Sequence, residues 1–134
     1  MDLPNPNTDT PAPFAGRILV VDDNQPSAMT LTWAMELNGY EVRTCFDGSS
    51  AVDVAHGFHP DVVLLDLGMP DVDGFEVCRR LRSDASLSGV TVIAQTGWGS
   101  SEMRRRTDEA GFNHHMTKPV DLSSLLKIVA ASIH

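Results

Sequence analysis

Short apolar runs alternate with longer amphipathic stretches along this chain from Arg17 onward. The runs are rich in β-branched residues and predict strands at 17–22, 40–45, 61–66, 90–95 and 112–117. Apolar positions at helical spacing predict helices at 26–39, 48–56, 101–110 and 121–133, and another that carries Phe75, Val77, Cys78 and Leu81. Repeated βα units favour a mainly parallel sheet with helices on both faces. The sequence therefore predicts one α/β domain of (βα)5 type over residues 16–134.

The ends of the predicted helices carry recognisable signals. Pro26 suits the first turn of the first helix, and Gly39 suits its end. Asp73 and Asp121 are predicted N-caps, because a short acidic side chain accepts hydrogen bonds from the free N–H groups of a first turn. Within the first helix, the residues expected to face the core recur every four positions and are Met29, Trp33 and Leu37.

Polar side chains follow several of the predicted strands, at the point where each strand ends. Asp22 ends the first predicted strand and Asp23 follows it, Asp66 ends the third, Thr96 follows the fourth and Lys118 follows the fifth. In an open parallel sheet these strand ends meet at one edge, where ligands bind. Three carboxylates brought together there would repel each other strongly, and a hard divalent cation such as Mg²⁺ would relieve that repulsion. The sequence therefore predicts a magnesium site at this edge.

The same edge has the parts needed for phosphoryl transfer. A carboxylate can act as a nucleophile toward phosphorus when a cation and a lysine neutralise the phosphoryl oxygens and a hydroxyl donates a hydrogen bond. Asp66, Lys118 and Thr96 fit these three roles.

Four motifs, V-V-D-D-N, L-L-D-L-G-M-P-D-V-D-G, A-Q-T-G-W-G and T-K-P-V, together resemble the receiver domain of two-component response regulators. The resemblance covers everything from Arg17 to His134. It implies a flavodoxin-like, doubly wound sheet of five parallel strands in the order 2-1-3-4-5. It also implies a cis peptide bond between Lys118 and Pro119, which an X-Pro bond adopts at a cost of only ~0.5 to 1 kcal/mol.

The resemblance assigns a role to each residue at the strand ends. Asp66 would accept a phosphoryl group from a histidine kinase or a histidine phosphotransfer protein, and Thr96 and Lys118 would contact its oxygens. Mg²⁺, or Mn²⁺ in its place, would be held by four groups: Asp22, Asp23, Asp66 and the backbone carbonyl of Gly68. Such a domain is a switch in phosphorelay signalling and no enzyme beyond its own phosphotransfer and dephosphorylation. It is expected in the cytoplasm.

The expected output is a change of protein partner. Receivers commonly use the fourth helix, fifth strand and fifth helix for this purpose, a face that would here include Met103, Arg104, Phe112 and Leu122. Asp71 and Asp73 are interpreted as turn residues. The run Arg104 to Arg106 is interpreted as a solvated helix face, because acidic residues surround it.

One residue departs from the usual receiver pattern. His115 stands where many receivers carry a Tyr or Phe that changes rotamer with the Thr hydroxyl, so that coupling is in doubt here. We expect Trp98, two residues after Thr96, to shield an aspartyl phosphate from water. His114 and His115 point to opposite faces of a regular strand, so they should not hold one metal ion together.

Two other classes of protein share this kind of sheet. A phosphatase with an aspartyl nucleophile usually carries a second acid two residues after that nucleophile, where this chain has Gly68. A flavin or nucleotide binder needs a phosphate-binding loop after the first strand. Asp22 and Asp23 would instead repel a phosphate there.

Composition narrows the partners further. The net charge of −8 disfavours direct binding to nucleic acid or to anionic membranes. No apolar run approaches the ~20 residues of a membrane-spanning helix, so no membrane insertion is expected. Cys45 and Cys78 have no metal-ligand spacing and are predicted to be reduced structural thiols.

The first 15 residues are rich in Pro, Asn and Thr and lack the features of a signal peptide, so a disordered or loosely docked tail is expected. Met1 and this tail favour a complete single-domain protein. The ending G-F-N-H-H-M-T-K-P-V instead resembles receivers attached to hybrid kinases, so both alternatives stay open.

Overall fold

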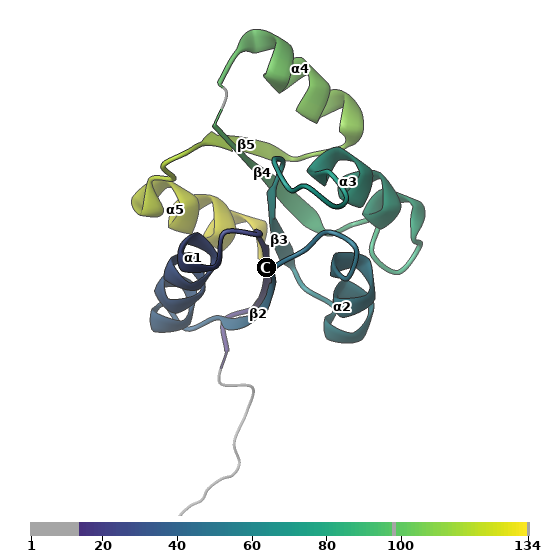
Figure 1. Ribbon diagram of the computed structural model, residues 1–134. Coiled ribbons are helices and arrows are strands. Elements are labelled where there is room, and N and C mark those ends of the chain that lie inside the picture. Colours follow the sequence, from purple (N-terminus) through teal and green to yellow (C-terminus); the bar gives the residue numbers. More distant parts are fainter. Residues whose placement is uncertain (1–13, 98, 134) are drawn as a thin grey trace, which may run out of the picture.

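The protein, described by a computed structural model over residues 14–97 and 99–133, consists of alternating strands and helices (Figure 1). The strands are β1 (Arg17–Val21), β2 (Glu41–Cys45), β3 (Val62–Asp66), β4 (Thr91–Thr96) and β5 (His114–Thr117). The helices are α1 (Gln25–Leu37), α2 (Ala51–Phe58), α3 (Gly74–Ser83), α4 (Ser101–Ala110) and α5 (Leu122–Ser132). The predicted element order is confirmed, with boundaries shifted by a few residues.

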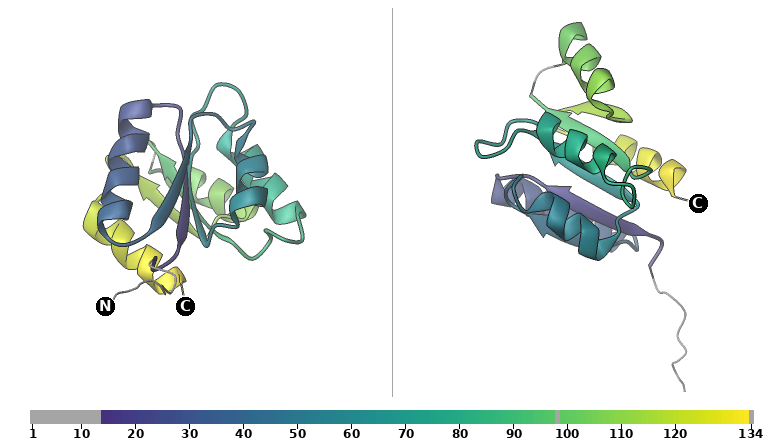
Figure 2. Two further views of the ribbon diagram at one scale, coloured as in Figure 1. Left: turned by 90° about the horizontal axis from the view of Figure 1, so that it is seen from below. Right: turned by 90° about the vertical axis from the view of Figure 1, so that its right-hand side faces the viewer.

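All five strands form one parallel sheet in the order β2-β1-β3-β4-β5. Helices α1 and α5 cover one face, and α2 and α3 cover the other, with α4 beside β4 and β5 (Figures 1 and 2). The chain reverses direction across the sheet after β2, so the β1 and β3 ends lie side by side at its centre. The predicted doubly wound (βα)5 fold is confirmed.

Each face of the sheet has its own core because successive strand side chains point to opposite sides. The core beneath α2 and α3 takes alternate strand residues, namely Leu19, Val21, Val63, Leu65, Val92 and Ala94. The core beneath α1 and α5 takes the intervening ones, namely Ile18, Val20, Val62, Leu64 and Ile93. The central strand β3 is buried along its whole length, which fixes the register of its neighbours.

The predicted core stripe of α1 is wrong. Trp33 is 58% exposed, Leu37 is 86% exposed and Met29 is only half-buried. The residues that face the sheet lie one or two positions earlier in the sequence than the predicted ones. They are Ala28, Leu31, Thr32 and Met35. Spacing alone fits both stripes. The small Ala28 and Thr32 face the sheet, and the Thr32 hydroxyl is satisfied by the Ala28 carbonyl and the Thr44 hydroxyl, so burying it costs little.

Several local predictions are confirmed. The side chain of Asp73 accepts a hydrogen bond from the Glu76 N–H, and that of Asp121 accepts one from the Ser124 N–H. Cys45 and Cys78 are free and buried. Most of the predicted tail, residues 1–13, lies outside the described residues. No helix in the described part of the chain is long and apolar enough to span a membrane.

Candidate functional site

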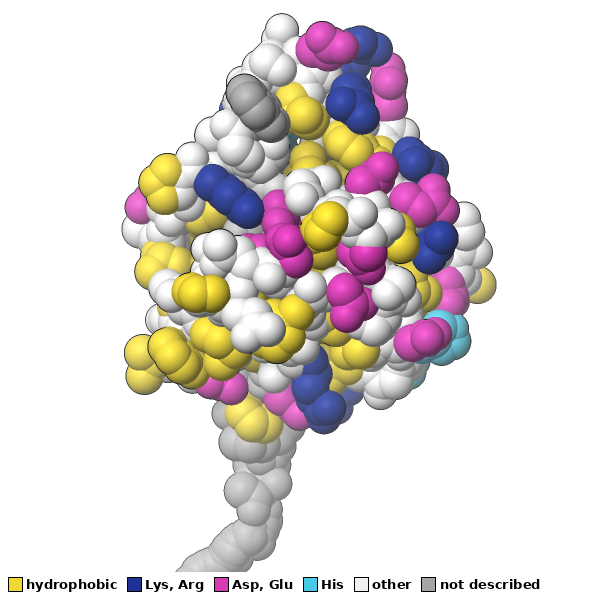
Figure 3. Space-filling view, in the orientation of Figure 1, with side chains coloured by type: hydrophobic (Ala, Val, Ile, Leu, Met, Phe, Trp, Pro, Cys, Tyr) yellow, Lys and Arg dark blue, Asp and Glu magenta, His cyan; other side chains and the backbone are white. Residues whose placement is uncertain are grey.

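The carboxyl edge of the sheet brings the predicted polar residues together. Asp22 follows β1, Asp66 and Thr96 end β3 and β4, and Lys118 follows β5. The first three of these side chains are almost fully buried, with exposures of 0%, 5% and 3% respectively. In the space-filling view, acidic side chains gather at the centre of this face with a basic side chain beside them (Figure 3).

Three carboxylates form a compact cluster. One oxygen from each of Asp22, Asp23 and Asp66 lies within 4.8 Å of the others. Asp23 is exposed, whereas the other two are buried. Gly68 adjoins the cluster, because its N–H donates to Oδ1 of Asp66 at 3.1 Å. The cluster gathers the three predicted side-chain ligands from two neighbouring strand ends.

Asp22 is a fully buried carboxylate with incomplete hydrogen bonding among the described residues. Its Oδ1 accepts a hydrogen bond from the Asn24 N–H at 2.9 Å, but its Oδ2 has no hydrogen-bond partner among the described residues. The pKa of Asp22 is raised to about 6, chiefly by burial and also by the Asp66 charge, while the Asn24 N–H and Lys118 oppose the rise. A buried carboxylate with an unsatisfied oxygen beside other carboxylates fits a hard cation such as Mg²⁺. The residues present therefore could hold that ion.

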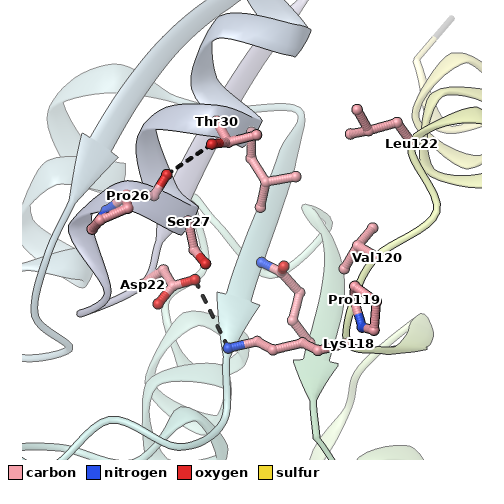
Figure 4. A pocket seen from close by; sticks show the side chains of 10 residues that line it. Asp22, Pro26, Ser27, Thr30, Lys118, Pro119, Val120 and Leu122 are labelled. Carbon is pink, nitrogen blue, oxygen red and sulfur yellow. Dashed lines mark hydrogen bonds and ion pairs between the residues drawn. The ribbon is translucent and has the colours of Figure 1, made fainter.

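Lys118 supplies positive charge to the cluster. Its Nζ lies 3.1 Å from Oδ1 of Asp66 and 3.9 Å from Oδ2 of Asp22. The side chain extends from the end of β5 across the sheet edge toward Asp22 (Figure 4). The peptide bond between Lys118 and Pro119 is cis, which confirms that prediction.

The two oxygens of Asp66 differ in their contacts. Oδ1 accepts hydrogen bonds from the Gly68 N–H and from Lys118 Nζ, both at 3.1 Å. Within the described part of the chain, no donor forms a hydrogen bond with Oδ2. One oxygen is thus held in place, and the other is available for chemistry.

A pocket of about 580 Å³ lies beside the cluster. Asp23, Asp66, Thr96 and Lys118 line it, so the structure brings these predicted residues to one cavity. Further lining residues that the sequence did not single out for this site are Asn24, Leu67, Asp73, Phe75, Gly97, Met103 and Arg106. The prediction for Trp98 lies outside the described residues.

The arginine run on α4 is an exposed helix face, as predicted. Arg104, Arg105 and Arg106 are all exposed, and Arg105 pairs with Glu109 at 3.3 Å. Arg106 also lies over the ring of Phe75, 4.4 Å from its centroid, and lines the pocket. The solvated-face interpretation is confirmed, and the contact of Arg106 with Phe75 is an addition to it. The spacing of three from Met103 to Arg106 puts both side chains on one side of the helix, the side that lines the pocket.

The predicted output face needs one correction. Phe112 is only 6% exposed and packs edge-to-face on Phe75 with ring centroids 6.0 Å apart, so it belongs to the core. Arg104 and Leu122 remain on the surface. His114 is exposed, whereas His115 is half-buried and lies 3.4 Å from the Thr107 hydroxyl, so the two histidines do face different surroundings as predicted.

Similarity to known proteins agrees with this geometry. The family model described as response regulator receiver domain matches residues 18–130. The chain is 36% identical over 115 residues to the protein PilH of Pseudomonas aeruginosa, covering 86% of this chain and 95% of PilH. It is 34% identical over 115 residues to the DNA-binding dual master transcriptional regulator RpaA of Synechocystis sp., covering 86% of this chain and only 48% of RpaA. The chemotaxis response regulator CheY4 of Vibrio cholerae matches with a TM-score of 0.82 at 26% identity, covering 88% of this chain and 98% of that structure.

Proposed function

Because this chain belongs to the response regulator receiver domain family, we propose that it accepts a phosphoryl group on Asp66 and acts as a switch in two-component signalling. The donor is a histidine kinase or a histidine phosphotransfer protein. The observation that carries this proposal is the asymmetry of Asp66, whose Oδ1 is held by Gly68 and Lys118 while Oδ2 has no hydrogen-bond donor among the described residues.

The chemistry follows from that asymmetry. Oδ2 of Asp66 attacks the phosphorus of a phosphohistidine, the P–N bond breaks, and the imidazole leaves with the bonding electrons and takes up a proton from solvent. Lys118 stabilises the negative charge that spreads over the phosphoryl oxygens in the transition state. Thr96, at the end of β4 on the same pocket, contacts one of these oxygens.

Asp22, Asp23, Asp66 and the backbone carbonyl of Gly68 would hold a divalent cation, Mg²⁺ or Mn²⁺. When bound, this cation neutralises negative charge on the carboxylates and on the incoming phosphoryl group. The compact cluster and the unsatisfied oxygen of Asp22 support this assignment.

The phosphorylated domain then favours a second conformation with a different partner preference. The surface that changes partner comprises α4, β5 and α5, where Arg104 and Leu122 are exposed. The net charge of −8 supports a protein partner over direct contact with nucleic acid. We place this signalling in the cytoplasm.

Incubation with acetyl phosphate and Mg²⁺ followed by intact mass measurement tests the proposal. The wild-type chain should gain one phosphoryl group, and the Asp66→Asn chain should gain none. Because the amide keeps the size of the side chain, the variant should stay folded, which circular dichroism would verify. A wild-type chain that is never modified, or an Asp66→Asn chain that is modified equally, would overturn the proposal.

A further inference from the structure

Arg106 is a second cation on the pocket that contains Asp66. It lies on α4, and the pocket lining joins it to Asp66, Lys118 and Thr96 from the ends of three strands. The lining also includes the loop after β3 and the start of α3 with Phe75. Arg106 therefore reaches the chemical site from an element outside the four family motifs.

The guanidinium of Arg106 has a weak partner in this state. It rests on the face of Phe75 at 4.4 Å from the ring centroid, and it forms no ion pair with any described residue. Its neighbour Arg105, by contrast, pairs with Glu109. A cation–π contact at an exposed position is weaker than a hydrogen bond between two charged groups. Arg106 is thus easily redirected by a new anion in the pocket.

Phosphorylation would create such an anion. The pocket holds the carboxylates of Asp23, Asp66 and Asp73, against the cations Lys118 and Arg106. An aspartyl phosphate carries about one more negative charge than the carboxylate it replaces, and it offers three strong acceptor oxygens. Lys118 is already committed to Asp66 at 3.1 Å. Arg106 is the remaining positive charge on the described lining.

We propose that Arg106 leaves Phe75 and binds the phosphoryl group on Asp66, which makes it a second cationic phosphoryl ligand and draws α4 toward the site. This inference rests on the function proposed above and adds a residue to it. The planar guanidinium fork suits two phosphoryl oxygens at once. The next residue on α4, Thr107, is buried and lies 3.4 Å from His115 of β5. A shift of α4 would therefore change the contact between α4 and β5.

Beryllofluoride, which occupies the phosphoryl position without covalent transfer, provides the probe. The affinity for beryllofluoride in the presence of Mg²⁺ is measured by ¹⁹F NMR titration for the wild type and for Arg106→Gln. Loss of one charged hydrogen-bonding partner should weaken binding about tenfold. Arg104→Gln removes the same charge from an exposed neighbour outside the pocket and should bind as the wild type does. Arg106→Lys should fall between the wild type and Arg106→Gln.

Phe75→Leu separates direct binding from packing. If Arg106 binds the anion, removing its resting partner leaves beryllofluoride binding as tight as in the wild type or tighter. If Arg106 merely holds Phe75 in place, Phe75→Leu weakens binding as Arg106→Gln does, and the inference is overturned. If the wild type binds beryllofluoride and Arg106→Gln binds it equally tightly, the inference about Arg106 is overturned while the proposed function stands. A wild type that takes up no beryllofluoride at Asp66 overturns the proposed function and this inference with it.

Discussion

Two pockets of similar size open on either side of Lys118, and they differ in charge. The pocket on the α3 and α4 side, about 580 Å³, is lined by the carboxylates of Asp23, Asp66 and Asp73. The pocket on the α1 and α5 side, about 600 Å³, contains one carboxylate, Asp22, and is otherwise lined largely by apolar and uncharged residues (Figure 4). The neighbours Asp22 and Asp23 thus line different pockets although their carboxylates belong to one cluster.

The comparison shows that a common sheet edge does not make both sides equivalent. On the α3 and α4 side, the pocket brings the phosphoryl acceptor Asp66 together with the cations Lys118 and Arg106 and with further carboxylates. Among the described residues that line it, the α1 and α5 side contains two buried polar atoms without a hydrogen-bond partner, Oδ2 of Asp22 and Nε2 of Gln95. We therefore assign the phosphoryl chemistry to the first pocket and expect the other residues of the second pocket, apart from Asp22 and Lys118, to be dispensable for it.

The largest effect should come from removing both acidic residues after β1. The double variant Asp22→Asn with Asp23→Asn keeps the shape of the loop but removes two of the three clustered carboxylates. Mg²⁺-dependent phosphorylation by acetyl phosphate should be abolished, because the cation loses its charged ligands. Intact mass measurement at increasing Mg²⁺ concentrations checks this. Wild-type levels of modification at ordinary Mg²⁺ concentrations would break the assignment of the metal site.

Lys118 should matter next, because it borders both pockets. Lys118→Ala removes the cation 3.1 Å from Asp66, and phosphorylation by acetyl phosphate should slow roughly a hundredfold, the scale seen when one transition-state donor is lost. Val120→Ala, a change that affects only the α1 and α5 pocket, is the matched control. Stopped-flow rates for both variants sharpen the comparison. Equal slowing by the two variants would contradict the division of roles.

Without bound metal, the Asp22 carboxylate should lower the free energy of unfolding over a defined pH range. Its folded pKa of about 6 is above the ordinary value of 3.8, so the unfolded state loses its proton first as the pH rises. Metal-free stability should therefore fall between about pH 4 and pH 6, in line with proton linkage. In Asp22→Asn this fall should be smaller, and the free energy of unfolding at pH 7 without metal should be about 1–2 kcal/mol higher than in the wild type.

Urea unfolding in the presence of a chelator, at several pH values, measures the free energy of unfolding of the wild type and of Asp22→Asn. The same measurement with Mg²⁺ should reverse the order, because only the wild type gains stability from the ion. If Asp22→Asn is the less stable chain without metal at pH 7, the electrostatic account of Asp22 is wrong.

The smallest effect belongs to the α1 and α5 pocket. Gln95 is 2% exposed, and its Nε2 has no hydrogen-bond partner among the described residues. Gln95→Leu should raise the free energy of unfolding by about 1 kcal/mol, because an unsatisfied buried amide is replaced by an apolar group of similar size. Its phosphorylation rate should match the wild type. A large loss of phosphorylation in this variant would show that the second pocket is part of the site.

The sheet and the strand-end site were predictable because both depend on local patterns. Apolar runs specify the strands that lead to Asp22, Asp66 and Thr96, whereas the strand before Lys118 is more polar. Parallel pairing brings the ends of all these strands together whatever the loops do. The core face of α1 was not predictable, because two stripes share the same spacing and the choice depends on the fit of small residues such as Ala28 against the sheet.

Contacts between secondary-structure elements were harder to predict from the sequence. Arg106 follows Arg104 and Arg105 in sequence, and nothing in the run itself distinguishes it from them. Its contact with Phe75 depends on how α4 packs beside α3, which is a tertiary property. Phe112 was assigned to the surface for a related reason, since its packing on Phe75 is visible only in the fold.

The identity of the phosphorylated residue is the central claim, and chemical trapping in the unmodified wild-type chain tests it most directly. The chain is phosphorylated with acetyl phosphate and Mg²⁺, reduced with borohydride, digested and sequenced by mass spectrometry. Borohydride converts an aspartyl phosphate to homoserine, so the modified position is read from the peptide itself. We predict homoserine at position 66 and at no other acidic residue. Homoserine at position 22, 23 or 73, or at none, would contradict the account.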